Sequence, residues 1–211
     1  GGSGETLIVL HNVSGTFVPV NLSSVPSLRD VVFDDVDGDG DLDMVCVPGV
    51  FAPGNGVFLL RNSGSLQYAV DPSAMPAGLP SCQSLALGDF DNDGDRDILA
   101  VQGSIAAPTG PLLLLRNGGG TFTDISATLP AIRTGQTCAA AADFDGDGNL
   151  DVALGRADAD LDMLWSTGTG FAAQTAVAAP GPIHSLFPFD ADLDGRADLG
   201  WAHTFISEVT L

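Results

Sequence analysis

Short apolar runs of four to six residues recur along the chain, and Gly, Asn and Asp separate them. The runs lack the 3.6-residue period of an amphipathic helix, so they predict β-strands. One run precedes an Asp-rich segment and a second follows it, as Val31–Phe33 and Met44–Val47 do. A third run, such as Val57–Leu60, and a fourth short segment after a Gly-rich turn complete the unit. Each unit is therefore expected to form four antiparallel strands.

The Asp-rich segments reveal a repeat. All four share the pattern Asp-x-Asp-x-Asp-Gly-x-x-Asp, and their first residues Asp35, Asp89, Asp143 and Asp190 are separated by 54, 54 and 47 residues. A lone four-stranded unit of this length cannot bury both faces, so the units must pack face to face around an axis. The predicted fold is all-β, a β-propeller of about four four-stranded blades with the acidic loops between first and second strands.

The point of the repeat at which the sequence starts indicates how a ring of blades would close. The chain begins with the equivalents of the third and fourth strands of a unit, Leu7–Leu10 and Phe17–Val20, and runs past the second strand of the fourth loop unit. We therefore expect the N-terminal and C-terminal strands to share one blade, because this arrangement leaves no open edge. Residues 5–211 are expected to form one domain, while Gly1–Gly4 reads as a flexible linker. The sequence does not decide between a closed ring formed by one chain and a larger ring formed by two copies of the chain.

The acidic loops have the chemistry of a cation site. Alternate residues in a tight loop project to one side, and Gly at the sixth position permits the bend. Hard oxygen ligands without His or Cys favour Ca²⁺, with Mg²⁺ as second choice. The residue at position twelve is apolar in every copy, unlike the Glu of an EF-hand, so the ninth residue must supply the last ligand.

The interpretation predicts about four Ca²⁺ ions, one per loop, with the seventh residue of each loop binding through its backbone carbonyl. The predicted ligands are Asp35, Asp37, Asp39, Asp41 and Asp43; Asp89, Asp91, Asp93, Asp95 and Asp97; Asp143, Asp145, Asp147, Asn149 and Asp151; and Asp190, Asp192, Asp194, Arg196 and Asp198.

Composition narrows the function. The chain has 27 acidic and 7 basic residues, a formal net charge of -20 and no lysine, so a phosphate-binding footprint for nucleic acid is not expected. No apolar run is long enough to cross a bilayer, so membrane insertion is not expected either. The three cysteines cannot all pair within one chain, and we interpret them as small buried hydrophobes, with one disulfide as the alternative. The common nucleophile, phosphate-loop and zinc-protease motifs do not occur in this sequence, and no catalytic residue is predicted.

Two further features receive structural interpretations. Arg61, Arg116 and His11 occupy the same position in successive units, which favours a role in blade packing or in a turn. The alternation of Asp158, Asp160 and Asp162 lacks the Gly of the loop motif, and we interpret it as a solvated loop.

The four loops and the strands around them resemble the FG-GAP or VCBS repeats of integrin alpha-chain propellers and of many secreted proteins. The resemblance spans about Leu7 to Trp201. It implies calcium in the loops on one face of a propeller and a partner on the opposite face. The fourth loop departs from the others at Leu193 and Arg196, and family propellers often have seven blades.

The leading hypothesis is a calcium-stabilised β-propeller that acts outside the cell, or in the periplasm, as a non-catalytic binding or adhesion scaffold. Weak loop sites would be filled by millimolar external calcium. A carbohydrate-binding lectin is one alternative, and a propeller-type polysaccharide lyase or hydrolase is another. The lack of lysine disfavours a lyase. The ligand, protein or glycan, is not identified by the sequence.

Overall fold

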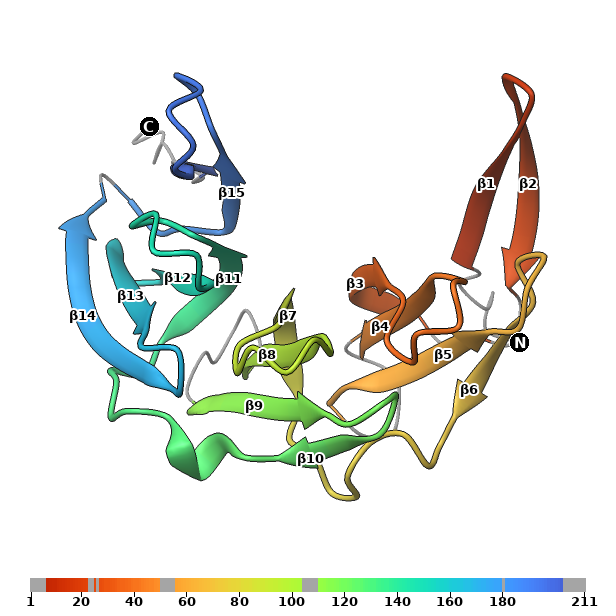
Figure 1. Ribbon diagram of the computed structural model, residues 1–211, viewed down its shortest axis with the longest axis horizontal. Helices are drawn as coiled ribbons and strands as arrows, with labels where there is room; N and C mark the ends of the chain where they lie inside the picture. The colour runs from red at the N-terminus through yellow and green to blue at the C-terminus, as the bar shows by residue number, and fades with distance from the viewer. Residues whose placement is uncertain are drawn as a thin grey trace, which may run out of the picture.

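The computed structural model describes residues 7–22, 25, 27–49, 56–103, 110–179 and 181–202. Within them the protein is built from antiparallel strands arranged along an arc (Figure 1). Three four-stranded sheets form complete blades, and a two-stranded sheet lies at each end of the arc. The order of strands in every sheet follows the order of the chain, so each blade is a meander. The predicted all-β fold with four-stranded antiparallel blades is confirmed.

The strands have the following bounds. Blade one contains β3 (Leu28–Asp34), β4 (Asp43–Pro48), β5 (Phe58–Asn62) and β6 (Tyr68–Asp71). Blade two contains β7 (Cys82–Gly88), β8 (Asp97–Gln102), β9 (Leu112–Asn117) and β10 (Phe122–Asp124), followed by a short 3₁₀ helix, η1 (Ser126–Thr128). Blade three contains β11 (Gln136–Ala142), β12 (Asp151–Arg156), β13 (Asp160–Ser166) and β14 (Phe171–Ala178). The end hairpins are β1 (Leu7–Val13) with β2 (Thr16–Leu22), and β15 (Ser185–Phe189) with β16 (Asp198–Ala202).

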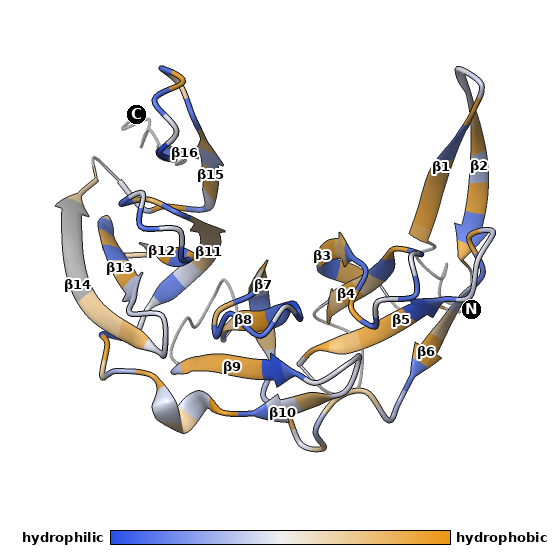
Figure 2. Ribbon diagram, in the orientation of Figure 1, coloured by the Kyte–Doolittle hydropathy of each residue, from blue (hydrophilic) through white to orange (hydrophobic). Residues whose placement is uncertain are grey.

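The core lies between blades rather than inside one sheet. The second strands β4, β8 and β12 are buried almost throughout, because a neighbouring blade or end hairpin packs on each of their two faces. Figure 2 shows the apolar stretches of these strands. One cluster joins blades one and two through Val45, Leu59 and Ile98, and another joins blades two and three through Leu99 and Leu154. Burial on both faces explains why the runs are continuously apolar rather than alternating.

The cysteines behave as the sequence predicts. Cys46, Cys82 and Cys138 are all buried as free thiols. Burial raises the thiol pKa to about 12 at Cys46 and Cys82 and to about 11 at Cys138. Thiols with such pKa values stay protonated at neutral pH, so they serve as packing groups rather than nucleophiles.

The two end hairpins belong to separate sheets. In Figure 1, β1–β2 and β15–β16 lie at opposite ends of the open arc. Both expose large apolar side chains, among them Leu10 and Phe17 at one end and Phe187 and Phe189 at the other. The blade shared by the two termini stays a prediction, as does the single domain over residues 5–211. The expected linker at Gly1–Gly4 lies outside the described residues.

Arginine joins the blades as predicted at one of the repeat positions. Arg61 on β5 donates to the carbonyl oxygen of Gly120 in blade two and forms ion pairs with Asp37 and Asp71. It therefore ties its own acidic loop and its own outer strand to the turn of the next blade. The blade-packing interpretation is confirmed for Arg61.

The interpretation of Asp158, Asp160 and Asp162 as a solvated loop holds for Asp158, which is exposed in a turn, and was wrong for Asp160 and Asp162. Asp160 and Asp162 lie on β13, and the Asp162 side chain is only 6% exposed. Arg133 forms ion pairs with both of these residues, and Arg156 pairs with Asp158 and lies 3.6 Å from Asp162. Asp160 and Asp162 are therefore part of a partly buried charge network, in which Arg133 is distant in the sequence and Arg156 is near.

We expect the packing between blades to carry most of the stability. Leu99→Ala leaves a cavity in the core between blades two and three and should lower the free energy of unfolding by about 2–5 kcal/mol. Leu193→Ala, at a side chain that is 86% exposed, should change it by no more than about 0.5 kcal/mol. Urea unfolding followed by circular dichroism measures both. Equal effects of the two substitutions would contradict the assignment of the core.

Candidate metal centres in the acidic loops

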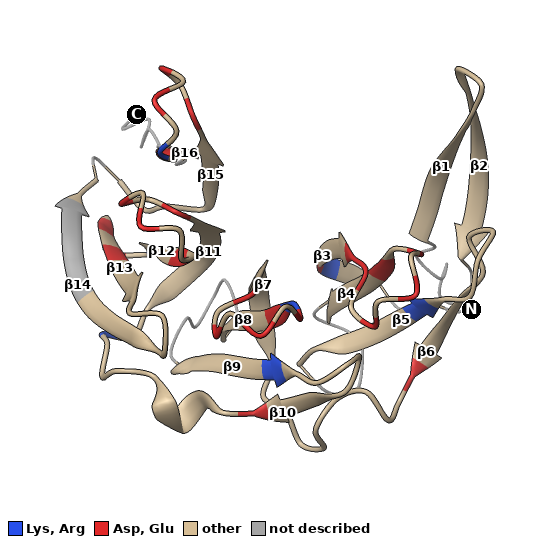
Figure 3. Cartoon of the chain, in the orientation of Figure 1, with Lys and Arg blue, Asp and Glu red and all other residues tan. Residues whose placement is uncertain are grey.

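The four acidic loops lie side by side on one face of the arc. Each joins the first strand of a unit to the second, and Figure 3 shows the acidic residues concentrated there. Neighbouring loops are in contact. Asn92 Nδ2 in loop two donates to Asn149 Oδ1 in loop three at 2.9 Å, and the Ala197 amide in loop four donates to the Asp143 carbonyl oxygen at 3.2 Å. Hydrogen bonds therefore join loop two to loop three and loop three to loop four.

The first Asp of each loop folds the loop around its own carboxylate. Its Oδ2 accepts a hydrogen bond from the backbone amide of the sixth-position Gly in all four copies, at 2.9–3.0 Å. The fifth-position carboxylate repeats this on a smaller scale, because its Oδ1 accepts from the seventh-position amide in every loop. The bonds to the fifth-position carboxylate are Asx turns, and the two sets of bonds together explain why short carboxylates recur at alternate positions.

Two positions of each loop adopt a left-handed backbone. The sixth-position Gly has a φ of 90° to 96° in every copy. The fourth position is also left-handed, and it is filled by Gly38, Asn92, Gly146 and Leu193. Gly and Asn tolerate this conformation, whereas for Leu193, with a φ of 62°, it is sterically unfavourable. The fourth loop is therefore the most strained of the four.

The ninth Asp anchors the loop in the blade. Asp43, Asp97 and Asp151 are at most 2% exposed, and the Oδ1 of each accepts a backbone amide of the third strand at 2.8 Å. Burial raises the pKa of all three carboxyls, that of Asp97 to about 6. Asp198 in loop four is exposed. Burying an ionised carboxylate without a cation is costly, so these three residues indicate a positive partner.

The structure brings three predicted ligands together in each loop, with carboxylate oxygens within 4.8 Å of one another. Loops one and four gather the first, third and fifth positions, and loops two and three gather the first, third and ninth. The groups are Asp35, Asp37 and Asp39; Asp89, Asp91 and Asp97; Asp143, Asp145 and Asp151; and Asp190, Asp192 and Asp194.

The remaining predicted ligands lie outside these groups. They include the fifth-position residues Asp93 and Asp147, and the ninth-position residues Asp43 and Asp198. The side chains at the seventh position, Asp41, Asp95, Asn149 and Arg196, are also outside, and their backbone carbonyls were the predicted ligands. The ligand list as a whole stays a prediction.

The donor set fits a hard divalent cation. In loop two the Oδ1 atom of Asp91 is buried and accepts no hydrogen bond from any described residue. It belongs to the group with Asp89 and Asp97, so an unpaired buried oxygen lies among three carboxylates. Every atom of the group is a carboxylate oxygen, which suits Ca²⁺ or Mg²⁺ and not a metal that prefers nitrogen or sulfur.

One contact of the site was not predicted from the sequence. Asp37, the third-position residue of loop one, is paired with Arg61. At the equivalent place in loop two, burial raises the pKa of Asp91, and the charge of Arg116 opposes this shift. The recurrence of Arg at one position of two units was a signal of this contact, but only the folded chain shows that the arginine meets the acidic loop of its own blade.

Four-stranded meanders repeated along an arc, each with an Asp-rich loop between its first two strands, define a propeller-type repeat protein with acidic loops that could hold a cation. The family profile described as FG-GAP-like repeat matches residues 35–100, 104–154 and 143–201. The chain belongs to the FG-GAP-like repeat family.

One solved structure with similarity to the chain is the crystal structure of the V. cholerae biofilm matrix protein Bap1. The similarity has 19% sequence identity and a TM-score of 0.41, and it covers 85% of this chain and 29% of that one. The chain thus corresponds to less than a third of the length of that protein. No curated protein matches the chain. Among the described residues there is no helix long and apolar enough to span a membrane.

The buried carboxyls predict that cation binding depends on pH. Because burial raises the pKa of Asp97 to about 6, this group is protonated at lower pH and must lose its proton to bind a cation. Calcium affinity should therefore weaken between about pH 7 and about pH 5, with proton release on binding in that range. Calorimetric titration in buffers of different ionisation enthalpy measures both quantities. An affinity that stays constant across this range would exclude a buried carboxyl from the site.

Proposed function

We propose that this protein is a calcium-stabilised scaffold that binds a partner outside the cell and does not catalyse a reaction. The observation that carries the proposal is the buried, unpaired Asp91 Oδ1 among the carboxylates of Asp89 and Asp97. A partly buried anionic cluster of this kind destabilises the folded chain unless a cation completes it. Because the loop recurs in four units, one cation in each would contribute to the stability of the whole chain.

Calcium is the cation that the loops favour. The ligands we propose are the three grouped carboxylates of each loop, joined by the seventh-position carbonyl oxygen. Calcium accepts six to eight oxygen ligands in flexible geometry, whereas Mg²⁺ demands a small octahedral cage. Two carboxylates about 4 Å apart repel by roughly 4 kcal/mol at an effective dielectric constant near 20, and a bound cation turns this repulsion into attraction.

The loops also explain how calcium would serve the scaffold. They contact one another along one face, and Asn117 Nδ2 of blade two donates to the Val36 carbonyl oxygen in loop one at 2.8 Å. Ordering one loop therefore orders part of the next blade. Sites of moderate affinity are filled at the millimolar calcium concentration outside cells, which supports an extracellular location.

A binding role suits the remaining chemistry better than catalysis does. The acidic side chains of the loops accept backbone hydrogen bonds that fix them in place. Such carboxylates are suited to hold a cation and are poor general acids. The net charge of -20 argues against nucleic acid as the partner and leaves proteins and glycans.

An experiment with the calcium-loaded chain separates a scaffold from an enzyme. The chain should bind members of an immobilised panel of glycans and matrix proteins, and the same soluble glycans should show no cleavage after prolonged incubation. Because calcium orders the blades, chelation should abolish the binding. A matched sample with calcium restored after chelation controls for irreversible damage. Product formation in proportion to protein concentration would overturn the non-catalytic assignment.

A further inference from the structure

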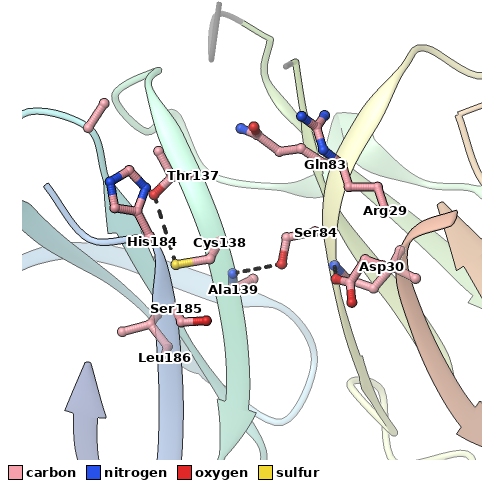
Figure 4. Close-up of a pocket in the computed structure, with 12 residues that line it drawn as sticks. Arg29, Asp30, Gln83, Ser84, Thr137, Cys138, Ala139, His184, Ser185 and Leu186 are labelled. Carbon is pink, nitrogen blue, oxygen red and sulfur yellow. Dashed lines mark hydrogen bonds between the residues drawn. The ribbon is translucent and has the colours of Figure 1, made fainter. Parts of the chain in front are cut away.

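A cavity of about 670 Å³ lies at the hub of the arc, where the innermost strands of four units face one another. Figure 4 shows its two walls. Residues of β3 and β7, including Arg29 and Gln83, form one wall, and Thr137 on β11 with His184, just before β15, forms the other. The volume falls in the usual range for a small-molecule site, which is about 300–1,000 Å³.

Four of the lining residues occupy one position of the repeat. Arg29, Gln83, Thr137 and His184 each lie six residues before the first Asp of their acidic loop. In the three complete blades the strand register shifts at this residue, between Leu28 and Asp30 and at the two equivalent places. Such bulges redirect a side chain away from the regular alternation of a strand. The same backbone irregularity therefore turns a different polar side chain into the cavity from each blade.

The next position of the repeat holds the walls together. Asp30 Oδ2 accepts the Leu85 amide of blade two at 2.8 Å, and Ser84 Oγ accepts the Ala139 amide of blade three at 3.4 Å. The other oxygen of Asp30, Oδ1, accepts the Val31 amide at 2.9 Å. Both carboxylate oxygens of Asp30 thus have structural partners, so this negative charge is already stabilised by backbone donors.

The lining position retains unused hydrogen-bonding groups. No described residue forms an ion pair or hydrogen bond with the Arg29 guanidinium, although acids far outnumber arginines in this chain. Gln83 uses Nε2 to donate to the Gln136 carbonyl oxygen at 2.7 Å, which leaves its Oε1 as an acceptor. Ser84 accepts through its oxygen, so its hydroxyl hydrogen is free to donate.

We propose that the hub cavity binds a small hydroxylated carboxylate, a sugar acid in chemical class. The planar guanidinium of Arg29 presents paired donors that match a carboxylate. The Gln83 Oε1 acceptor and the Ser84 hydroxyl suit ligand hydroxyl groups beside it. This assignment names the ligand class of the proposed scaffold and rests on that function. The ligand arrives as a free acid or as the end of an acidic polysaccharide, and both present the same group.

Calorimetric titration of the calcium-loaded chain tests the site, with D-glucuronate as probe and D-glucose as its uncharged counterpart. Glucuronate should bind and glucose should bind at least about tenfold more weakly, because the charged contact to Arg29 is lost. Arg29→Gln should weaken glucuronate binding by about tenfold or more. Arg133→Gln is the matched control, because Arg133 lies outside both the cavity and the acidic loops and should leave the affinity unchanged.

A short oligomer of uronic acids distinguishes the sources, since tighter binding than the monomer indicates a polysaccharide end and equal binding indicates the free acid. Equal affinity for glucuronate and glucose, no binding of either acid, or an unchanged affinity in Arg29→Gln would overturn the proposal. Melting curves of the same samples with and without calcium separate this failure from failure of the scaffold itself. If calcium stabilises the chain but no acid binds, the scaffold proposal stands and the ligand proposal fails.

Discussion

The structure depends on the placement of carboxylates where water cannot fully solvate them. Asp43, Asp97 and Asp151 are buried at the bases of their loops, and each spans from the loop to the third strand of its blade. The same residue that closes a loop thus aligns two strands. Its burial requires compensation, because an isolated buried carboxylate costs several kcal/mol; backbone donors supply part of it, and the proposed cation would supply the rest. The chemistry of the loops and the geometry of the blades therefore depend on the same three residues.

Contacts between neighbouring units link the ordered loops and strands of one blade to those of the next. Apolar second strands pack against both neighbouring blades, while Arg61, Asp30 and Gln83 make polar contacts from one blade to the next. Because each unit meets only its neighbours, stability is expected to accumulate unit by unit. The hub cavity follows from the same arrangement, since the innermost strands of successive units converge there.

The features that repeat along the chain could be predicted from the sequence. Apolar runs flanking Asp35 and Asp89 predicted strands that became β3, β4, β7 and β8, and Gly at the sixth loop position predicted the bend, where the structure has a left-handed backbone. Features that depend on distant residues were not predictable. The charges of Asp160 and Asp162 looked solvated because their partner Arg133 lies far away in the sequence. Arg29, Gln83, Thr137 and His184 share a repeat position but no residue type, so only the folded chain showed that they face one cavity. Closure of the ring likewise depends on pairing between distant hairpins.

Thermal unfolding with calcium and with a chelator tests the central claim most directly. If buried carboxylates require the cation, removal of calcium should lower the melting temperature by roughly ten degrees or more, and added calcium should restore it, because ligands that bind only the folded state stabilise it. Sodium chloride at matched ionic strength should not replace calcium, because screening acts weakly on buried groups. A melting curve that is the same with and without calcium would contradict the account.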